Sequence, residues 1–562
     1  MRITIILLLL AGILAAPFLL RPGGESRTAS LRRAEHLVII TPHNQSIQAE
    51  FGQAFIRYMK QSRGRDVYID WRTPGGTSEI ARFLKSEYAT RFESLWKRKT
   101  QGLRFTHLIR EAFTNPKIDV PPTQQGQVPD LTLLSHPDAA KERAVYARQL
   151  FLDSDIGIGI DLFFGGGAYD FSKQAQAGNL VPRDAGGSYG PAALAEEHPD
   201  WFSDAVMPAN VSGEPFRDSR FRWVGTVLSS FGICYNEDVL RRLGIKVSPA
   251  QWNDLTDIRL AGQIALADPT KSGSTTKAFE MLIQQQIRGA LNGMQTQARA
   301  ASAVEHDAIR QGWDRAMRMI FKISANARYF TDSATKVPYD VAAGDAGAGM
   351  CIDFYGRTYN ELHRDSAGHS RVQFVMPKGG TSIGADPIGM LRGAPNPELA
   401  HRFMEFVLSP EGQRIWDFKT GAPGGPRRFA LRRPPIRKDF YTAENRQFMA
   451  DPDINPYLIG KDFLYEGKWT GSLFTPMRFI IRCGCVDTHE ELHSTWRAMI
   501  KAGMPAAALR EFEDLSIISY DRVLGDIAPV LRSNDKIQEV ELARKLSGIF
   551  REKYRKCRHL CP

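Results

Sequence analysis

Three turns of the chain combine glycine with residues that could hold an anion, and each lies between an apolar run and a helical pattern. They occupy 75–78, 165–167 and 272–276, and the last is the richest in hydroxyl groups. A helix N-terminus after such a turn presents free backbone N–H groups and the positive end of the helix dipole. We therefore expect a phosphate, phosphonate or carboxylate site. Its candidate residues are Gly76, Thr77, Ser78, Gly166, Ser272, Gly273, Ser274 and Thr275.

Each turn also has a purely structural interpretation. Ser and Thr are favoured at helix N-caps, and glycine at 165–167 permits a tight turn. The residues alone leave capping and binding equally open. A P-loop is excluded at 272–276, because Lys271 precedes Gly273 instead of following the second glycine of the motif. We therefore do not expect nucleotide hydrolysis.

Apolar runs alternate with helical patterns along most of the chain, which predicts an α/β fold with mainly parallel sheets. Predicted strands include 36–41, 67–71, 156–164, 263–267 and 350–354. Ligands of such sheets bind at the carboxyl ends of the strands, and all three turns follow strand ends. This coincidence predicts a binding cleft. A polar, proline-containing stretch at about 91–147 interrupts the pattern and is expected to be an insertion.

The stretch from Tyr235 to Thr275 reads YNEDVL…PAQWNDL…GQIALADPTKSGST. It resembles the middle of a periplasmic solute-binding protein of an ABC importer, of the ferric-ion, phosphonate and sugar-phosphate type. Residues 385–416 resemble the strand and helix that return to the first lobe in that family. The resemblance covers about 37–425. It implies a two-lobed, type II-like periplasmic-binding-protein fold that closes on its solute by a hinge motion.

The resemblance also implies a division of the chain. We expect lobe 1 in residues 36–230 and 370–425, lobe 2 in 231–369, and crossings near 229–235 and 357–372. Residues 440–562 show no importer pattern and are expected to form a helix-rich C-terminal extension, for which docking to a partner is one role. A monomer that delivers its solute to an inner-membrane ABC permease is implied, with no catalysis and no cofactor.

Asp353 and Tyr355 bear on the identity of the solute. Ferric-binding relatives carry two adjacent tyrosines at the matching strand end, whereas this chain has Asp353-Phe354-Tyr355. We expect the turns to hold an anionic group while Asp353 and Tyr355 recognise the organic part or a cation. A small phosphorylated or phosphonate compound is the predicted solute, and ferric ion with a bound anion is the alternative. Asp353 could instead cap the strand end or form a hinge salt bridge.

Other charged residues receive structural interpretations. His43 follows a strand end and could contact a ligand or a metal, but a surface-loop histidine is the favoured interpretation. Asp386 is expected to be structural. The formal net charge is +11, and a basic cluster at 427–438 contributes to it. We interpret this cluster as a solvated connector. No RNA- or DNA-binding motif accompanies it, so a nucleic-acid partner is not expected.

The six cysteines are compatible with an exported protein, in which disulfides persist. We expect the four late cysteines to bridge one another, although the sequence does not determine their pairing. These are Cys483, Cys485, Cys557 and Cys561. Cys234 and Cys351 lie in apolar runs and are expected to be buried thiols.

The late cysteines also belong to a possible metal motif. Cys483 and Cys485 precede His489 and His493, which are four residues apart in a His-Glu-x-x-His pattern. A zinc-dependent hydrolase is therefore the alternative from another functional class, although no third ligand pattern follows. A ligand-sensing subunit of a signalling system is a further alternative that the extension permits.

The N-terminus carries an export signal. Residues 3–20 contain no charged residue and follow Arg2, the pattern of a signal peptide. The cleavage site is poor, and the stretch nearly reaches the roughly 20 residues that span a bilayer. Residues 1–24 are thus expected to be a signal peptide or an uncleaved membrane tether. Both place the body in the periplasm or another extracytoplasmic space.

Overall fold

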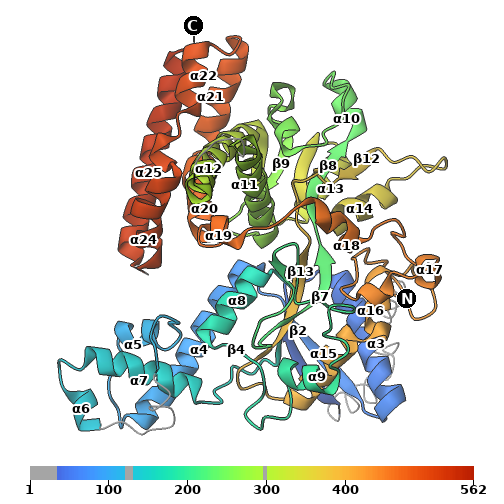
Figure 1. Ribbon diagram of the computed structural model, residues 1–562, viewed down its shortest axis with the longest axis vertical. Coiled ribbons are helices and arrows are strands. Elements are labelled where there is room, and N and C mark those ends of the chain that lie inside the picture. Colours follow the sequence, from blue (N-terminus) through green and yellow to red (C-terminus); the bar gives the residue numbers. More distant parts are fainter. Residues whose placement is uncertain (1–33, 121–130, 295–299, 534, 562) are drawn as a thin grey trace, which may run out of the picture.

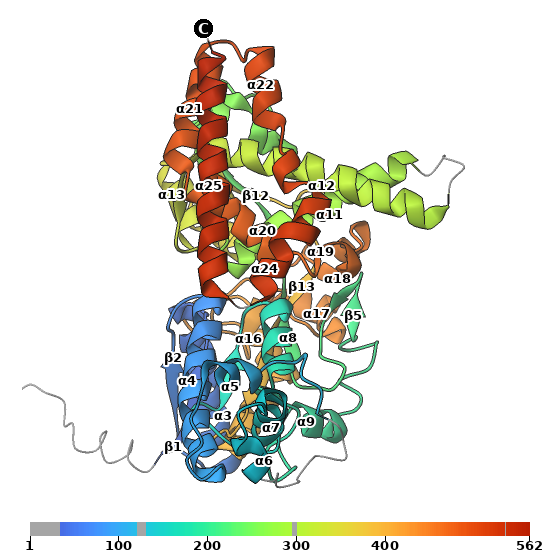
Figure 2. The same cartoon turned by 90° about the vertical axis from the view of Figure 1, so that its left-hand side faces the viewer.

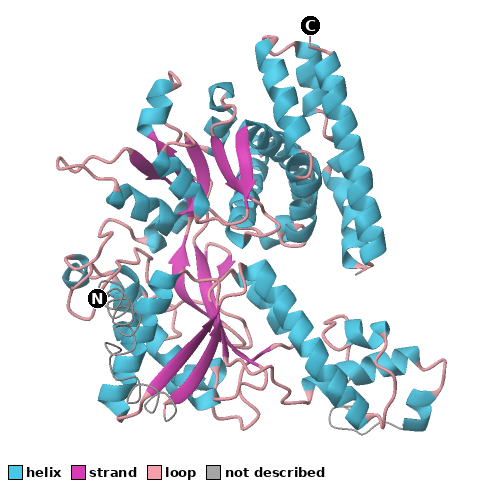
Figure 3. Cartoon of the chain, turned by 180° about the vertical axis from the view of Figure 1, so that it is seen from behind, coloured by secondary structure: helices cyan, strands magenta, loops and turns pink. Residues whose placement is uncertain are grey.

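The computed structural model describes residues 34–120, 131–294, 300–533 and 535–561. The expected signal peptide or tether, residues 1–24, lies outside the described residues. Within the described ranges, no helix is long and apolar enough to cross a membrane. The predicted two-lobed α/β architecture is confirmed: each lobe contains its own sheet flanked by helices, with a helical extension at the C-terminal end (Figures 1 and 3).

The sheet of lobe 1 has the order β2-β1-β3-β13-β4, with β7 paired to β13. Its first strands are parallel, and β13 runs antiparallel to its neighbours. The strands are β1 (Glu35–Ile40), β2 (Val67–Arg72), β3 (Leu162–Phe164), β4 (Leu180–Val181), β7 (Val224–Ser229) and β13 (Gly384–Leu391). The helices include α3 (Gln45–Arg63), α4 (Thr77–Lys99), α8 (Ala168–Ala177), α9 (Pro191–Glu197), α15 (Pro397–Leu408) and α16 (Pro410–Asp417).

The sheet of lobe 2 has the order β10-β9-β11-β8-β12. Strand β9 is parallel to β10 and β11, while β8 is antiparallel to β11 and β12. Both sheets are therefore mixed, and the prediction of mainly parallel sheets is wrong. The strands are β8 (Phe231–Asn236), β9 (Ile264–Ala267), β10 (Ala327–Thr331), β11 (Ala348–Ile352) and β12 (Val372–Val375). The helices include α10 (Glu237–Arg242), α11 (Gly273–Met294), α12 (Ala301–Asn326), α13 (Lys336–Ala343) and α14 (Asp353–Leu362). Strand β9 is buried along its whole length, as its uninterrupted apolar sequence requires.

The crossings between the lobes differ in part from the prediction. The chain passes from β7 to β8 at Ser230, inside the expected 229–235. It returns only after β12, because β12 pairs with β8 in the second sheet; the return therefore lies beyond the expected 357–372. Residues 427–438 then pack on lobe 1, where Pro435 bridges to Val227 of β7. Strand β3 is also shorter than the predicted 156–164.

The stretch at 91–147 adds helices to lobe 1. Helix α4 continues to Lys99 and is followed by α5 (His107–Ala112), α6 (Leu131–Ser135) and α7 (Ala140–Leu152). Aromatic side chains hold them together: the rings of Phe92 and Phe113 stack 4.6 Å apart. This helical group lies at the end of lobe 1 away from lobe 2 (Figure 1).

The C-terminal extension packs on lobe 2 and shares its hydrophobic core. Its main helices are α20 (Phe474–Ile481), α21 (His489–Lys501), α22 (Ala506–Glu513), α24 (Ala528–Arg532) and α25 (Lys536–His559). Trp496 of α21 is buried, and its indole N–H donates to Asn326 of α12 at 2.7 Å. Figure 2 shows α25 running along this side of the molecule. The extension is therefore fixed to lobe 2.

Among the described residues the six cysteines are free thiols. The disulfides expected among the late four are therefore wrong: these are Cys483, Cys485, Cys557 and Cys561. The first two lie two residues apart in one π-helical turn, so their side chains point in different directions. The last one donates its thiol hydrogen to the Cys557 carbonyl at 3.2 Å. The expectation that Cys234 and Cys351 are buried thiols is confirmed.

Candidate functional site

A cavity of about 500 Å³ lies between the lobes and is lined by strand ends and helix starts from both. Several residues predicted from the sequence line it: Gly76, Thr77, Gly166, Ser272, Gly273, Ser274 and Tyr355. Ser78, Thr275 and Asp353 are not part of the lining. Residues beyond the predicted set, from 427–438 and from the C-terminal extension, complete the walls.

Three helices direct their N-termini at this cavity. Gly76 and Gly167 are the N-caps of α4 and α8, and neither has a side-chain oxygen that could cap the helix. Helix α11 begins at Gly273, and the Ser272 hydroxyl accepts a hydrogen bond from the Thr275 N–H at 3.2 Å. Ser272 and Thr275 therefore do serve as a structural cap. The N-terminal N–H groups of α4 and α8 have no such partner, which makes this end of the cavity favourable for negative charge.

The turns of the two lobes touch each other. A Cβ atom on Gly76 would lie 2.8 Å from the Lys271 carbonyl oxygen, and one on Gly273 would lie 2.9 Å from the Thr77 hydroxyl oxygen. Gly166 has a φ of +131°, and a Cβ there would meet the Thr77 methyl group at 2.4 Å. Glycine is thus required by close approach and, at Gly166, by backbone conformation. The structure brings the predicted turns together in a closed arrangement.

Arg433 is a site residue that the sequence analysis missed. It is 0% exposed, and its guanidinium lies over the rings of Phe354 and Trp416, 4.5 and 5.3 Å from their centroids. Its Nη2 donates to Asp386 Oδ2 at 2.5 Å and to the Ser229 hydroxyl at 2.7 Å. The interpretation as a solvated connector is therefore wrong for Arg433 and Arg437, which are buried, and fits only Arg427 and Arg428, which are exposed. The two prolines that follow Arg433 gave no signal of a return to the cavity.

His43 and Asp386 lie beside Arg433 and line the cavity. His43 is buried, with its Nε2 3.4 Å from Arg433 Nη1, so the surface-loop prediction is wrong. Burial lowers the pKa of His43, which keeps the ring neutral near pH 7. Although burial opposes it, the Arg433 guanidinium holds the pKa of Asp386 below its usual value. Asp386 has the expected structural role, as the counter-ion of Arg433.

Asp353 and Tyr355 are separated by the fold. The buried Asp353 carboxylate accepts hydrogen bonds from the Ser230 hydroxyl and from Arg357 Nη2, both at 3.1 Å. This is the hinge salt bridge that the sequence left open as the alternative, and neither Asp353 nor Arg357 lines the cavity. Tyr355 lines the cavity, and burial raises its pKa to about 12.

A second charged group lines the cavity near the extension. The Lys277 ammonium lies 2.7 Å from Glu214 of lobe 1 and 2.9 Å from Glu280. It also lies 3.9 Å from the centroid of the Tyr465 ring, whose hydroxyl donates to Glu280 at 2.8 Å. Burial opposes the charge on Lys277, but the two carboxylates outweigh burial and raise its pKa. The sequence analysis missed this group, because Glu214 and Tyr465 are far from Lys277 along the chain.

The predicted metal motif does not form a metal site. His489 is hydrogen-bonded through Nε2 to the Ala327 carbonyl at 3.0 Å, and its ring stacks on that of His493 with centroids 5.8 Å apart. Cys483 and Cys485 are buried in the core of lobe 2 and do not converge with these histidines. The zinc-hydrolase alternative is therefore wrong in its proposed ligands.

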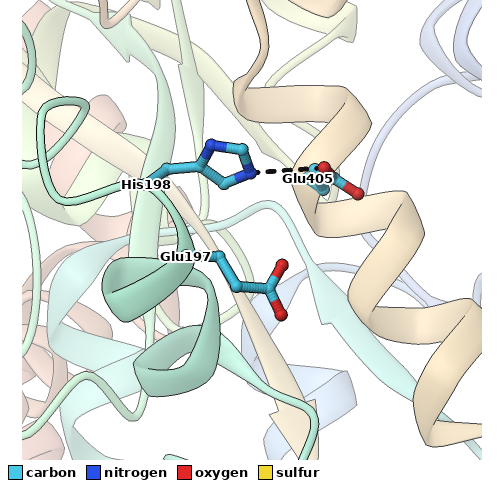
Figure 4. Close-up of side chains that lie close together, drawn as sticks. All are labelled: Glu197, His198 and Glu405. Atoms are coloured by element: carbon cyan, nitrogen blue, oxygen red, sulfur yellow. Dashed lines mark hydrogen bonds and ion pairs between the residues drawn. The ribbon is translucent and has the colours of Figure 1, made fainter.

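A different group in the described part of the chain has metal-like spacing: Glu197, His198 and Glu405 (Figure 4). Glu405 accepts from His198 at 3.2 Å and from Arg402 at 2.9 Å. Arg402 also lies 3.8 Å from Glu197. Because a guanidinium already neutralises these carboxylates, we interpret the group as an ion-pair network that joins α9 to α15.

The family model of the bacterial extracellular solute-binding protein matches residues 155–438, slightly more than half of the chain. The chain belongs to the bacterial extracellular solute-binding protein family. Such proteins are the solute-binding components of ABC importers, and the matched range contains the 272–276 turn, Asp386 and Arg433. The extension after residue 438 lies outside the match.

Individual relatives are distant. An uncharacterized protein of Haemophilus influenzae is 25% identical over 261 residues, which are 45% of this chain and 60% of that protein. The phosphoglycerate transport regulatory protein PgtC of Salmonella typhimurium is 23% identical over 247 residues, or 44% of this chain and 52% of that protein. The chain thus spans between about half and three fifths of the length of these curated relatives.

Solved structures of periplasmic binding proteins are similar at low sequence identity. AfuA from Actinobacillus pleuropneumoniae, with fructose-6-phosphate bound, is 15% identical with a TM-score of 0.45; the match covers 78% of this chain and 98% of that one. Iron-bound HitA from Pseudomonas aeruginosa is 13% identical with a TM-score of 0.43, covering 79% and 98%.

Proposed function

We propose that this extracellular solute-binding protein captures a small anionic solute, a phosphorylated or phosphonate compound, and delivers it to an inner-membrane ABC permease. The observation that carries the proposal is the convergence of the α4, α8 and α11 N-termini on one cavity between the lobes. The proposal involves no catalytic step and no cofactor.

In this proposal the helix N-termini bind the anionic solute, and their binding of it also favours closure of the two lobes. Each contributes a positive partial charge and free N–H donors, and an anion at such an end is typically stabilised by about 0.3–1 kcal/mol, up to ~2 when partly buried. Because α4 and α8 belong to lobe 1 and α11 to lobe 2, an anion can contact all three only when the lobes are closed. A solute that binds the closed form better shifts the population toward it.

Arg433 also favours an anionic solute in the cavity. Its guanidinium is always charged, and its Nε hydrogen has no partner although it is buried. Asp386 occupies Nη2, so the side chain retains donors for a further acceptor. A carboxylate or phosphate oxygen of the solute is the acceptor that matches these donors best.

Ferric ion fits the cavity less well. The tyrosines of the cavity lining, Tyr169, Tyr355 and Tyr465, come from three separate segments of the chain. Two of their hydroxyls already have partners, since that of Tyr169 is hydrogen-bonded to Thr475 and that of Tyr465 donates to Glu280. Tyrosine hydroxyls can donate hydrogen bonds to a polar organic solute.

A second candidate function is a solute-sensing subunit of a signalling system. The Salmonella relative is named a phosphoglycerate transport regulatory protein, which favours this alternative. A sensor would use the same cavity and differ in its partner. Co-purification with a permease or with a membrane kinase would distinguish the two.

Thermal unfolding of the purified protein tests the proposal, with 3-phosphoglycerate, fructose 6-phosphate, inorganic phosphate and ferric citrate as probes. A phosphate compound should stabilise the protein by about 2.7 kcal/mol at 100 times its dissociation constant. Ser274→Tyr, which fills the cavity wall, should abolish the shift. Ser516→Tyr, on an exposed turn of the extension, is the matched control and should preserve it. Stabilisation by ferric citrate alone would contradict the proposal.

A further inference from the structure

Helix α20 of the C-terminal extension reaches from lobe 2 to lobe 1 beside the cavity. One face is anchored in the core of lobe 2, where Met477, Ile480 and Ile481 are buried. Phe474, Thr475 and Arg478 of the same helix contact residues of the two lobes. The extension is thus rigidly joined to one lobe while it contacts the other.

Arg478 joins the first turns of two of the helices that point at the cavity. Its Nε donates to the Thr276 hydroxyl of α11 at 3.0 Å, and its Nη1 donates to the Ser78 hydroxyl of α4 at 3.3 Å. Its Nη2 is buried, has no hydrogen-bond partner among the described residues, and lies 3.8 Å from the position of a Cβ on Gly273. One guanidinium therefore fixes the α4 turn of lobe 1 against the α11 turn of lobe 2.

The positive charge of Arg478 also acts on the first turn of the third helix, α8. Asp170, in the first turn of α8, is buried and interacts with the Thr77 hydroxyl. Burial raises the pKa of Asp170, and the positive charge of Arg478 opposes that shift. Arg478 thus offsets a carboxylate that would otherwise weaken the attraction of the cavity for an anion.

Aromatic contacts extend this connection along the cavity wall. The ring of Phe474 lies 4.4 Å from that of Tyr169 in α8, and both side chains line the cavity. The hydroxyls of Tyr169 and Thr475 are hydrogen-bonded at 3.1 Å. The Arg478 guanidinium also lies over the Phe474 ring, 4.6 Å from its centroid.

We propose that the C-terminal extension completes the solute site, with α20 as its third wall and Arg478 as a positioning residue. Arg478 holds the N-terminal turns of α4 and α11 in the arrangement that binds the anionic group, and it keeps the lobes closed before solute arrives. This inference rests on the proposed function of the cavity. It places the determinant of affinity in a segment outside the range that the family model matches.

Binding of 3-phosphoglycerate and of inorganic phosphate to the full chain tests the affinity, measured by calorimetry and stopped-flow dissociation. Arg478→Met should weaken binding of the better probe about tenfold or more, mainly through faster dissociation. Arg478→Lys should recover part of the loss, because it restores the charge without the fork of donors. Ser78→Ala, which removes only the lobe 1 partner, should cause a smaller loss in the same direction.

The matched control is Arg482→Met on the next turn. Arg482 also lies over a phenylalanine ring, that of Phe479, but its carboxylate partner, Asp487, belongs to the extension itself. This variant should bind with wild-type affinity. An equal loss in Arg482→Met and Arg478→Met, or wild-type affinity in Arg478→Met, would overturn the proposal.

Small-angle scattering of the solute-free protein tests whether Arg478 keeps the lobes closed. This test does not depend on which solute the protein binds. The wild type and Arg482→Met should have the same radius of gyration, while Arg478→Met and Ser78→Ala should have larger ones. If no phosphate compound binds the wild type, the proposed function fails, and the radii still decide whether the extension holds the lobes. Equal radii in all four proteins would overturn that role. If Arg478→Met does not fold, Ser78→Ala alone decides.

Discussion

Arg433 and Lys277 both line the cavity, and their surroundings differ in a way that assigns them different roles. Arg433 lies between two aromatic rings and faces one carboxylate, Asp386. Lys277 lies between two carboxylates, Glu214 and Glu280. The charge of Arg433 is thus balanced with donors to spare, whereas that of Lys277 is overcompensated. We therefore propose that the Lys277 group joins the two lobes, whereas Arg433 is available to the anionic solute.

The largest effect should come from removing Arg433. Arg433→Met leaves Asp386 enclosed without its partner, which should lower the free energy of unfolding by about 3–5 kcal/mol. It should also abolish binding of the phosphate probe in calorimetry. The double variant Arg433→Met with Asp386→Asn should recover most of the stability in urea unfolding, because the uncompensated charge is gone, but it should not recover binding. Recovery of binding in the double variant would show that Arg433 serves only the fold.

A smaller effect is expected at Lys277. Glu214→Gln removes the carboxylate of lobe 1 and leaves Lys277 paired with Glu280. The free energy of unfolding should fall by about 1–3 kcal/mol through the weakened buried contact. Solute affinity should change by less than about threefold, since Lys277 is still neutralised. An increase of tenfold or more would contradict the comparison, because it would show that Lys277 binds the anion once it is released.

The contrast also explains what the sequence could predict. Turns at 75–78, 165–167 and 272–276 were recognisable because backbone N–H groups, glycine and hydroxyl residues act locally, next to strand and helix patterns. The two-lobed fold followed from the same alternation and from the resemblance at 235–275. Arg433, Glu214 and Tyr465 could not be found, because the segments that carry them reach the cavity through tertiary packing, which the local sequence does not show.

The wrong expectations have the same physical origin. The polarity of His43 and Arg433 predicts exposed side chains, yet the fold packs His43 against Trp416 and Arg433 against Phe354. The late cysteines were interpreted from the export signal, whereas helix geometry keeps Cys483 and Cys485 from pairing. Asp353 was assigned to the solute although the hinge gives it closer partners in Ser230 and Arg357.

The pH dependence of stability gives a further test of the surroundings of Arg433, because His43 lies beside it. The pKa of His43 is lowered in the folded protein by burial, so the unfolded state binds the proton first as pH falls. His43 therefore contributes stability that is complete above its unfolded pKa of about 6.5 and is lost as pH falls through that value. His489 and His493 also have pKa values lowered by burial and act in the same direction.

His43→Asn isolates that contribution. It should reduce the loss of unfolding free energy between about pH 7.5 and 5.5 by roughly 1 kcal/mol, measured in urea at each pH. His489→Asn is the matched variant in the extension, away from the cavity. It should reduce the slope as well but leave solute binding unchanged at both pH values. A His43→Asn protein with the wild-type slope would show that His43 is already protonated beside Asp386.

The smallest effect is expected at the Tyr465 hydroxyl, beside Lys277. Tyr465→Phe keeps the ring under the ammonium group and removes only the hydrogen bond to Glu280, which Lys277 and the Thr470 hydroxyl continue to satisfy. The free energy of unfolding should therefore fall by only about 0.5–1 kcal/mol in urea. Tyr465→Leu, which also removes the cation–π contact, should cost more. If Tyr465→Phe instead weakens solute binding as strongly as Arg433→Met, the hydroxyl contacts the solute, and the Lys277 group is a second binding wall instead of a joint.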